Sequence, residues 1–347
     1  MSACSCSKAD TAPVYSAATS DIAAVVTEQT TAVQKYSRIV FAMDTVMELT
    51  VYAENETILD QAAEQITELE GKLSVTLSDS EIYALNSTGS KLLSEDTAYL
   101  LESALKLCES TDGALDITVY PVVSAWGFTT GKYKIPSDAE LSALLEKVDY
   151  STVTLHEQTA AIPTNVQVDL GSVAKGYTGD ALSKLFRENG VTSALLNLGG
   201  NVQTIGSKPD GTPWRIAVKH PTDTENYLGV LSISNMAAIT SGGYERYFVG
   251  EDGCTYWHIL DPSTGKPADS RILSVTVVGE SGLLCDAMST ALFVMGLDDA
   301  LDYWRNQQEF EVIFVTDDEK IYITEGLEEL FVVSEQYTAS SVTVVRR

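Results

Sequence analysis

The first candidate for a functional site is the stretch DLGSVAKG at residues 169–176. Asp169 ends an alternating apolar run, Gly171 permits a tight turn, and a helix pattern with Lys175 in its first turn follows. The free amides and the positive dipole end of a helix N-terminus favour bound anions, and a nearby lysine adds to this attraction. The same residues also fit a helix that Ser172 caps, with its lysine facing solvent, so spacing alone leaves both interpretations open.

A second candidate is the stretch CDAMST at residues 285–290. On a helix, Asp286, Ser289 and Thr290 stand at positions i, i+3 and i+4 and therefore share one face. Hard oxygen atoms in this arrangement suit Mg²⁺, which takes one or two carboxylates together with phosphate and water oxygens. An aspartate favoured by the helix dipole, with the serine and threonine bonded to the backbone, explains the pattern equally well.

The third candidate is His258, in the stretch WHILDPSTGKPAD at residues 257–269. A neutral imidazole can take a proton near neutral pH and could serve as a general base. A lone histidine in an apolar strand is more often structural, so both roles remain open. The other two histidines, His156 and His220, lie in segments without convergent chemistry.

The apolar pattern predicts the elements that must position these residues. Residues 38–53 read as two strands with a break near Asp44, and Val166, Val168 and Leu170 alternate as a strand. Apolar spacings of three and four predict helices at residues 58–73, 96–110, 137–148, 173–190 and 283–296. Further strands are expected in the stretches SALLNLGGN, WRIAVKHP, LGVLSIS, AAITSGGYERYFVG and ILSVTVVGE. The mixture indicates an α+β fold with a largely antiparallel sheet and packed helices.

The amino-acid composition limits the kinds of molecule that the protein can bind. The chain has 347 residues, of which 44% are hydrophobic, and a formal net charge of −27. Such a surface repels nucleic acid and anionic lipid, so we expect no nucleic-acid partner. An anionic substrate would need local positive groups or a metal to offset that charge. The sequence contains no apolar run long enough for a transmembrane helix.

The first residues, MSACSC, resemble a bacterial lipobox, Leu-Ser-Ala-Cys, whose leucine is replaced by Met. On that interpretation Cys4 carries the lipid of an extracytoplasmic lipoprotein that is anchored to the bacterial cell membrane. Residues 1–35 would then be the remnant of the leader and a flexible tether rich in Ala, Ser and Thr. The alternative is a chance Ser-Ala-Cys in a cytosolic protein. We expect one catalytic domain over residues 36–347.

Nine blocks of sequence follow one another in a characteristic order. They are FAMDTVMEL, LSVTLSDSEIYALN, GALDITVYPVVSAWGF, VDLGSVAKGYTGDAL, NLGGNV, PDGTPWRIAVKHP, TSGGYERYF, HILDPSTGKP and CDAMSTALFVMG. Together these blocks, over about residues 38–300, resemble the ApbE family, the FAD:protein FMN transferases. The resemblance implies a T-fold-like α+β flavin transferase architecture, with FAD as substrate and Mg²⁺ as cofactor.

The activity that the resemblance implies is transfer of FMN from FAD to a Thr or Ser hydroxyl of a target protein, as a phosphoester, with release of AMP. Some members of the family hydrolyse FAD to FMN and AMP. The targets are typically membrane-bound electron-transfer subunits of the Rnf and sodium-pumping NADH:quinone oxidoreductase complexes, and extracytoplasmic flavoproteins.

The resemblance also implies roles for single residues. His258 matches the general base, and Asp286 and Thr290 match the metal ligands, together with the Ser172 carbonyl and, as a further ligand, Ser289. The residues expected to contact FAD, in the last case through nearby backbone, are Met43, Thr76, Ala114, Leu115, Asp116, Asp169, Lys175 and Leu260.

Two positions depart from the family's pattern. Asp44 stands where the family has the Gly of Met-Gly-Thr. Thr76 stands where many members have an aromatic residue that stacks on the flavin, and where some hydrolytic members have a small polar residue. Transfer of FMN to a protein is the leading hypothesis. The alternatives are an FAD pyrophosphatase that yields FMN and AMP, and a non-catalytic flavin-binding lipoprotein.

Overall fold

The fold is built on a sheet of nine strands in which every neighbouring pair is antiparallel except β15 and β17. The computed structural model describes residues 33–223, 225–335, 337 and 342–347. In spatial order the strands are β1 (Gln34–Ala42), β2 (Thr45–Ala53), β6 (Ala194–Leu198), β7 (Asn201–Ile205), β10 (Ala237–Gly242), β13 (Ile272–Gly279), β14 (Phe310–Thr316), β15 (Ile321–Thr324) and β17 (Val342–Val345). The predicted α+β class with a largely antiparallel sheet is therefore confirmed.

Short strands form three smaller sheets among the described residues. These are β16 (Phe331–Val333) with β9 (Tyr227–Ile233) and β8 (Trp214–Lys219), then β3 (Ser90–Leu92) with β5 (Thr159–Ala161) and β4 (Thr154–His156), and finally β11 (Tyr247–Val249) with β12 (Thr255–Trp257). The first of them packs on the central sheet through a shared apolar cluster that contains Leu231, Val278 and Ile313.

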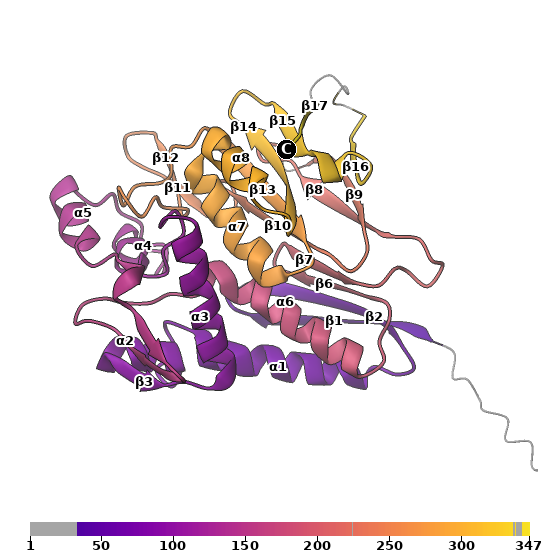
Figure 1. Cartoon of the computed structure of the whole chain (residues 1–347), viewed down its shortest axis with the longest axis horizontal. Helices are drawn as coiled ribbons and strands as arrows, with labels where there is room; N and C mark the ends of the chain where they lie inside the picture. Colours follow the sequence, from indigo (N-terminus) through magenta and orange to yellow (C-terminus); the bar gives the residue numbers. More distant parts are fainter. Residues whose placement is uncertain (1–32, 224, 336, 338–341) are drawn as a thin grey trace, which may run out of the picture. The chain divides into compact units, whose positions relative to one another are not determined.

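The helices pack mainly against the other face of the sheet, where α6 and α7 lie side by side (Figure 1). They are α1 (Thr57–Leu73), α2 (Glu81–Thr88), α3 (Glu95–Ser110), α4 (Tyr120–Trp126), α5 (Asp138–Leu145), α6 (Gly171–Glu188), α7 (Gly282–Met295) and α8 (Leu297–Arg305). Single turns of 3₁₀-helix occur at η1 (Tyr150–Thr152) and η2 (Glu325–Leu327).

Local sequence explains most of these helices. The apolar residues that predict α1, from Ile58 to Leu73, are all buried against the sheet or neighbouring helices. Helix α5 begins where its capping signal predicts, because the Ser137 hydroxyl accepts the Glu140 N–H at 3.2 Å. Helix α4 contains Pro121 in its first turn, where the missing N–H costs nothing.

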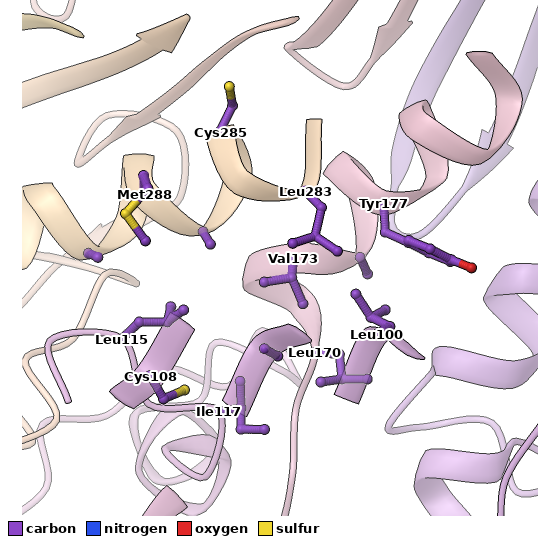
Figure 2. Packing of buried hydrophobic residues seen from close by; sticks show 14 of the residues in the cluster. Leu100, Cys108, Leu115, Ile117, Leu170, Val173, Tyr177, Leu283, Cys285 and Met288 are labelled. Atoms are coloured by element: carbon purple, nitrogen blue, oxygen red, sulfur yellow. The ribbon is translucent and has the colours of Figure 1, made fainter. Parts of the chain in front are cut away.

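The central packing contact is the crossing of α6 and α7. A β-carbon on Gly176 would lie 2.2 Å from the Gly282 carbonyl oxygen, so the two helices approach as closely as backbone allows. Figure 2 shows Val173 of α6 and Leu283 of α7 at this junction, with Leu170 and Leu100 close by in the same buried cluster.

Asp180 of α6 fastens the start of α7. Its Oδ1 accepts the Gly282 N–H at 2.7 Å and its Oδ2 accepts the Leu283 N–H at 3.0 Å. Gln203 of β7 also donates to Asp180 Oδ1 at 2.7 Å. These bonds satisfy amides that have no partner within α7, and a carboxylate at this helix end is favoured by the dipole.

Two local predictions are wrong. Residues 166–170 alternate in burial but form no strand, because the Asn86 side chain accepts the Val168 N–H at 2.7 Å and donates to the Val168 carbonyl at 2.8 Å. A side chain thus takes the place of a neighbouring strand. Ser172 does not cap α6; it lies inside the first turn, and the carboxylate of Asp169 accepts the Gly171 N–H at 2.8 Å instead.

The predicted tether at residues 1–35 lies almost wholly outside the described residues, and so does the predicted lipid site at Cys4. Residues Val33–Arg347 form one compact unit, and its first strand begins at Gln34. None of the described helices has the length and apolar character needed to span a membrane.

Replacing Gly176 by Ala should destabilise the protein by about 1–3 kcal/mol, because the added methyl group overpacks the contact between α6 and α7. Urea unfolding measures this change. The matched control is Gly71→Ala in α1, whose added β-carbon meets no atom within 4 Å and should stabilise the helix by up to about 1 kcal/mol. Equal unfolding midpoints for Gly176→Ala and the unmodified protein would contradict the packing argument.

Candidate active site

The three candidate stretches converge where α6 and α7 begin. Lys175 Nζ on α6 lies 3.7 Å from Asp286 Oδ1 on α7. The charge of Lys175 also reaches the imidazole of His258, where it lowers the pKa. A cation, a carboxylate and an imidazole from segments far apart in sequence therefore surround one region of the molecule.

Asp286 is positioned by the backbone of α6. Its side chain is only 6% exposed, and its Oδ2 accepts the Gly176 N–H at 2.8 Å. In a regular helix that N–H would pair with the carbonyl of Ser172, four residues earlier, so the carboxylate and this carbonyl compete for one donor. The Asp286 carboxylate is thus bound to the backbone of the first turns of α6, the segment that contains the carbonyl of Ser172.

The two hydroxyls of the predicted metal site differ. The buried Ser289 hydroxyl donates to the Asp286 carbonyl at 2.8 Å and pairs with the Ser241 hydroxyl of β10, also at 2.8 Å. Among the described residues, the Thr290 hydroxyl contacts the same Ser241 at a longer distance of 3.4 Å. The Thr290 hydroxyl is thus less engaged than that of Ser289, and the metal-binding roles of both residues stay predictions.

This donor set fits Mg²⁺ and no softer metal. Within the described ranges, no group of three or more His, Cys, Asp or Glu side chains could hold a metal ion. Asp286 supplies one carboxylate, and hydroxyl and carbonyl oxygens supply the rest. Mg²⁺ is commonly held in this way, by one or two carboxylates together with substrate phosphates and water.

His258 directly follows the last residue of β12 and therefore lies at the end of a strand. The Arg246 carbonyl accepts the His258 backbone N–H at 3.0 Å and lies 3.2 Å from Nδ1. A carbonyl can only accept, so Nδ1 carries the proton and Nε2 keeps its lone pair. The geometry therefore prepares Nε2 as a proton acceptor.

The surroundings of His258 keep its imidazole neutral. Burial lowers the pKa of His258 from 6.5 to about 4, and the positive charges of Arg246 and Lys175 act in the same direction. The ring also meets the edge of Phe128, with the ring centroids 6.3 Å apart. At neutral pH the imidazole is thus available as a base.

Asp169 lies within reach of the charge of Arg246. Burial raises the pKa of its carboxyl group, whereas the bond from Gly171 and the charge of Arg246 lower it. Met43 also approaches α6: its sulfur lies 3.8 Å from the hydroxyl of Thr178. Among the predicted FAD contacts, Asp169, Lys175 and Met43 are therefore at or near the start of α6.

The remaining predicted FAD contacts have other surroundings. The Asp116 carboxylate accepts bonds from Thr118 and from the Tyr150 N–H, Leu115 belongs to the main apolar cluster, and Ala114 is partly buried between them. Leu260 packs in a separate apolar cluster with residues of α4 and α5. Thr76 is exposed, in the loop after α1. The roles assigned to these residues stay predictions.

Sequence reasoning missed Glu245 and Arg246, which precede β11. Burial raises the pKa of Glu245, Asp286 raises it further, and Lys175 and Lys219 lower it, so this carboxylate belongs to the same charged region. The only signal was a charged pair after the Gly-Gly turn of TSGGYERYF. Nothing in that local pattern indicates how close these residues lie to α6 and α7.

Known proteins share this arrangement of sequence and fold. The sequence pattern that defines the ApbE family matches residues 43–314. The FAD:protein FMN transferase of Vibrio cholerae serotype O1 is 32% identical over 252 residues, which are 70% of this chain and 75% of that protein. An FAD:protein FMN transferase of Klebsiella pneumoniae is 30% identical over 296 residues, which cover 83% of this chain and 92% of that protein.

A solved structure gives the same result for the fold. The crystal structure of the ApbE protein from Thermotoga maritima superposes with a TM-score of 0.80 and 31% sequence identity. The superposition covers 86% of this chain and 99% of that protein.

The imidazole of His258 should titrate near pH 4, well below the 6.5 of an unperturbed histidine. Its folded pKa is lower than its unfolded pKa, so the unfolded chain binds more protons between these values. This group therefore reduces the free energy of unfolding as the pH falls from about 6.5 towards 4. Histidine NMR measures the titration, and His258→Gln identifies the signal. A midpoint near 6.5 would contradict the lowered pKa that we infer from the surroundings of His258.

Proposed function

Because the chain belongs to the ApbE family, we propose that this enzyme transfers FMN from FAD to a protein, the activity for which its relatives are named. One observation carries the proposal. Lys175 lies 3.7 Å from the Asp286 carboxylate, in the first turns of α6 and α7, and its charge acts on the neutral imidazole of His258, whose pKa is lowered mainly by burial. This arrangement suits a reaction in which a hydroxyl attacks a polyanionic phosphate group.

In the proposed reaction, the amides at the start of α6 and the Lys175 ammonium group bind the pyrophosphate of FAD. His258 Nε2 takes the proton of the acceptor hydroxyl, while the Arg246 carbonyl holds Nδ1–H. The acceptor oxygen forms a bond to the phosphorus on the FMN side. The bridging bond from that phosphorus to the AMP oxygen breaks, and AMP leaves with the electron pair. Phosphoryl transfer of this kind depends on positioning and on compensation of charge.

Asp286, Thr290 and the Ser172 carbonyl would hold Mg²⁺, with Ser289 behind them. When bound, the ion would neutralise charge on the pyrophosphate and on the departing AMP. This assignment is supported by the buried carboxylate of Asp286, its bond to the Gly176 N–H of α6 and the long contact of the Thr290 hydroxyl.

The acceptor would be a Thr or Ser hydroxyl of a target flavoprotein. The sequence resemblance favours a subunit of an Rnf or NADH:quinone oxidoreductase complex, or an extracytoplasmic flavoprotein. The Ser-Ala-Cys at residues 2–4 supports an extracytoplasmic enzyme whose Cys4 carries a lipid. FAD hydrolysis is the second candidate, because Thr76 is an exposed small side chain where a flavin could otherwise stack.

Incubation with FAD, Mg²⁺ and a candidate acceptor protein should give a covalent flavin adduct on that acceptor. By mass spectrometry the adduct should equal one FMN less one water, because one phosphoester forms. The same incubation without an acceptor separates the alternatives. An FAD pyrophosphatase would release AMP and FMN at full rate without an acceptor, and a flavin-binding protein would release neither.

Replacing Asp286 by Asn should lower kcat about 100-fold or more, because a metal ion contributes several kcal/mol of charge stabilisation in the transition state. The variant should also lose the Mg²⁺ dependence of FAD affinity, which flavin fluorescence measures without turnover. Asp299→Asn, at an exposed position of α8, is the matched control and should change neither quantity. Unchanged Mg²⁺ dependence in Asp286→Asn would remove this residue from the metal site.

A further inference from the structure

Arg246 connects the predicted base to the turn between β1 and β2. Its carbonyl binds His258 through both the backbone N–H and Nδ1. Its guanidinium Nη2 lies 3.7 Å from Asp44 Oδ2 in that turn. The same positive charge is felt by the carboxyl group of Asp169, at the start of α6. Arg246 therefore contacts the β1–β2 turn through its side chain and His258 through its backbone.

The turn that carries Asp44 is strained. Met43 and Asp44 have φ angles of +50° and +58°, although both have a β-carbon. A two-residue hairpin turn of this kind favours Asn-Gly, because glycine enters the left-handed region without steric cost. The Glu70 carboxylate accepts the Met43 N–H at 2.7 Å and holds the turn in place. Strain that persists in this way is common where a side chain has a function.

The ion pair itself contributes little stability. The Asp44 side chain is 86% exposed and that of Arg246 is 48% exposed. Exposed pairs of this type are weak, because water screens both charges. An arginine held by such a partner can exchange it for a stronger anion at small cost, and its planar fork of donors matches phosphate oxygens.

The two cations near His258 differ in the exposure of their ion-pair partners. Lys175 lies 3.7 Å from the Asp286 carboxylate and near a second one, Glu245. By contrast, the ion-pair partner of Arg246 is the exposed Asp44, at the same separation. In a chain with a net charge of −27, a cation whose ion-pair partner is exposed can still attract an anionic substrate.

We propose that Arg246 is a further substrate-binding residue, whose guanidinium exchanges Asp44 for the phosphoryl oxygens of FAD beside His258. Asp44 holds the guanidinium near the site when FAD is not bound. The exchange is non-covalent: two ionic hydrogen-bonding partners change, and no bond of the substrate breaks. The role of Arg246 in the transfer step rests on the proposed function, because there the guanidinium would stabilise charge on the phosphoryl group as it moves to the acceptor.

A double-mutant cycle tests the exchange. FAD dissociation constants are measured by flavin fluorescence for the unmodified protein, Asp44→Asn, Arg246→Gln and the double variant. Asp44→Asn should tighten FAD binding by up to about fivefold, because it removes a competing partner of Arg246 and keeps a residue that tolerates the turn. In the Arg246→Gln background the same change should have no effect. Equal effects of Asp44→Asn in both backgrounds would overturn the proposal.

Turnover provides the second readout. Arg246→Gln should lower kcat about 100-fold, as removal of one charge-stabilising donor does in other enzymes. Arg246→Lys, which keeps the charge but not the fork, should fall between Arg246→Gln and the unmodified protein. A kcat of Arg246→Gln equal to that of the unmodified protein would exclude the transfer role.

Structural damage and failure of the proposed function can both be distinguished. The Arg246 variants keep the backbone carbonyl that holds His258, so the urea midpoint should not change. Burial, which is the main cause of the low pKa of His258, also stays, but Arg246→Gln removes a positive charge that lowers this pKa and should raise it, whereas Arg246→Lys should leave it nearly unchanged. Arg271→Gln, at an exposed ion pair with Asp317, is the matched control and should leave FAD binding and turnover unaltered. If the unmodified protein transfers no FMN, the proposed function fails, while the FAD-binding cycle still decides whether Arg246 exchanges partners.

Discussion

The close approach of α6 to α7 is the constraint on which the site depends. No side chain fits between Gly176 and Gly282, so the backbone of one helix meets the backbone of the other. Because of this contact, Asp286 can accept a hydrogen bond from an α6 amide and lie next to Lys175. A wider separation would leave a buried carboxylate without its donor, at a cost of several kcal/mol.

Asp286 and His258 are each held in position by hydrogen bonds from a different part of the fold. Asp180 fixes the start of α7 through its first free amides, and Gln203 fixes Asp180 from the central sheet. His258 depends on the small β11–β12 sheet, since the carbonyl that selects its tautomer belongs to Arg246. The candidate site is thus held together mainly by hydrogen bonds between different helices and strands.

This division explains what could be predicted from the sequence. The faces of α1 and α7, including the shared face of Asp286, Ser289 and Thr290, follow from helical periodicity, which is a local property. The missing strand at 166–170 could not be foreseen, because Asn86, about 80 residues earlier, takes the place of a neighbouring strand. The importance of Arg246 is likewise invisible locally, since its ion-pair partner lies on a hairpin about 200 residues away.

The chain contains few positive charges, and this limits where it can attract an anionic substrate. The chain as a whole is strongly acidic, so an anionic substrate gains attraction only where cations and helix amides gather. With a single carboxylate in the donor set, the protein alone would bind Mg²⁺ weakly, and substrate phosphates would have to complete its coordination. In the proposed reaction, FAD and the metal ion therefore bind more tightly together than either does alone, and this coupling is reciprocal. A chain that supplied more carboxylates would hold the ion better and repel the pyrophosphate more strongly. In the proposed site, an uncharged Ser289 hydroxyl beside Asp286 would keep this balance.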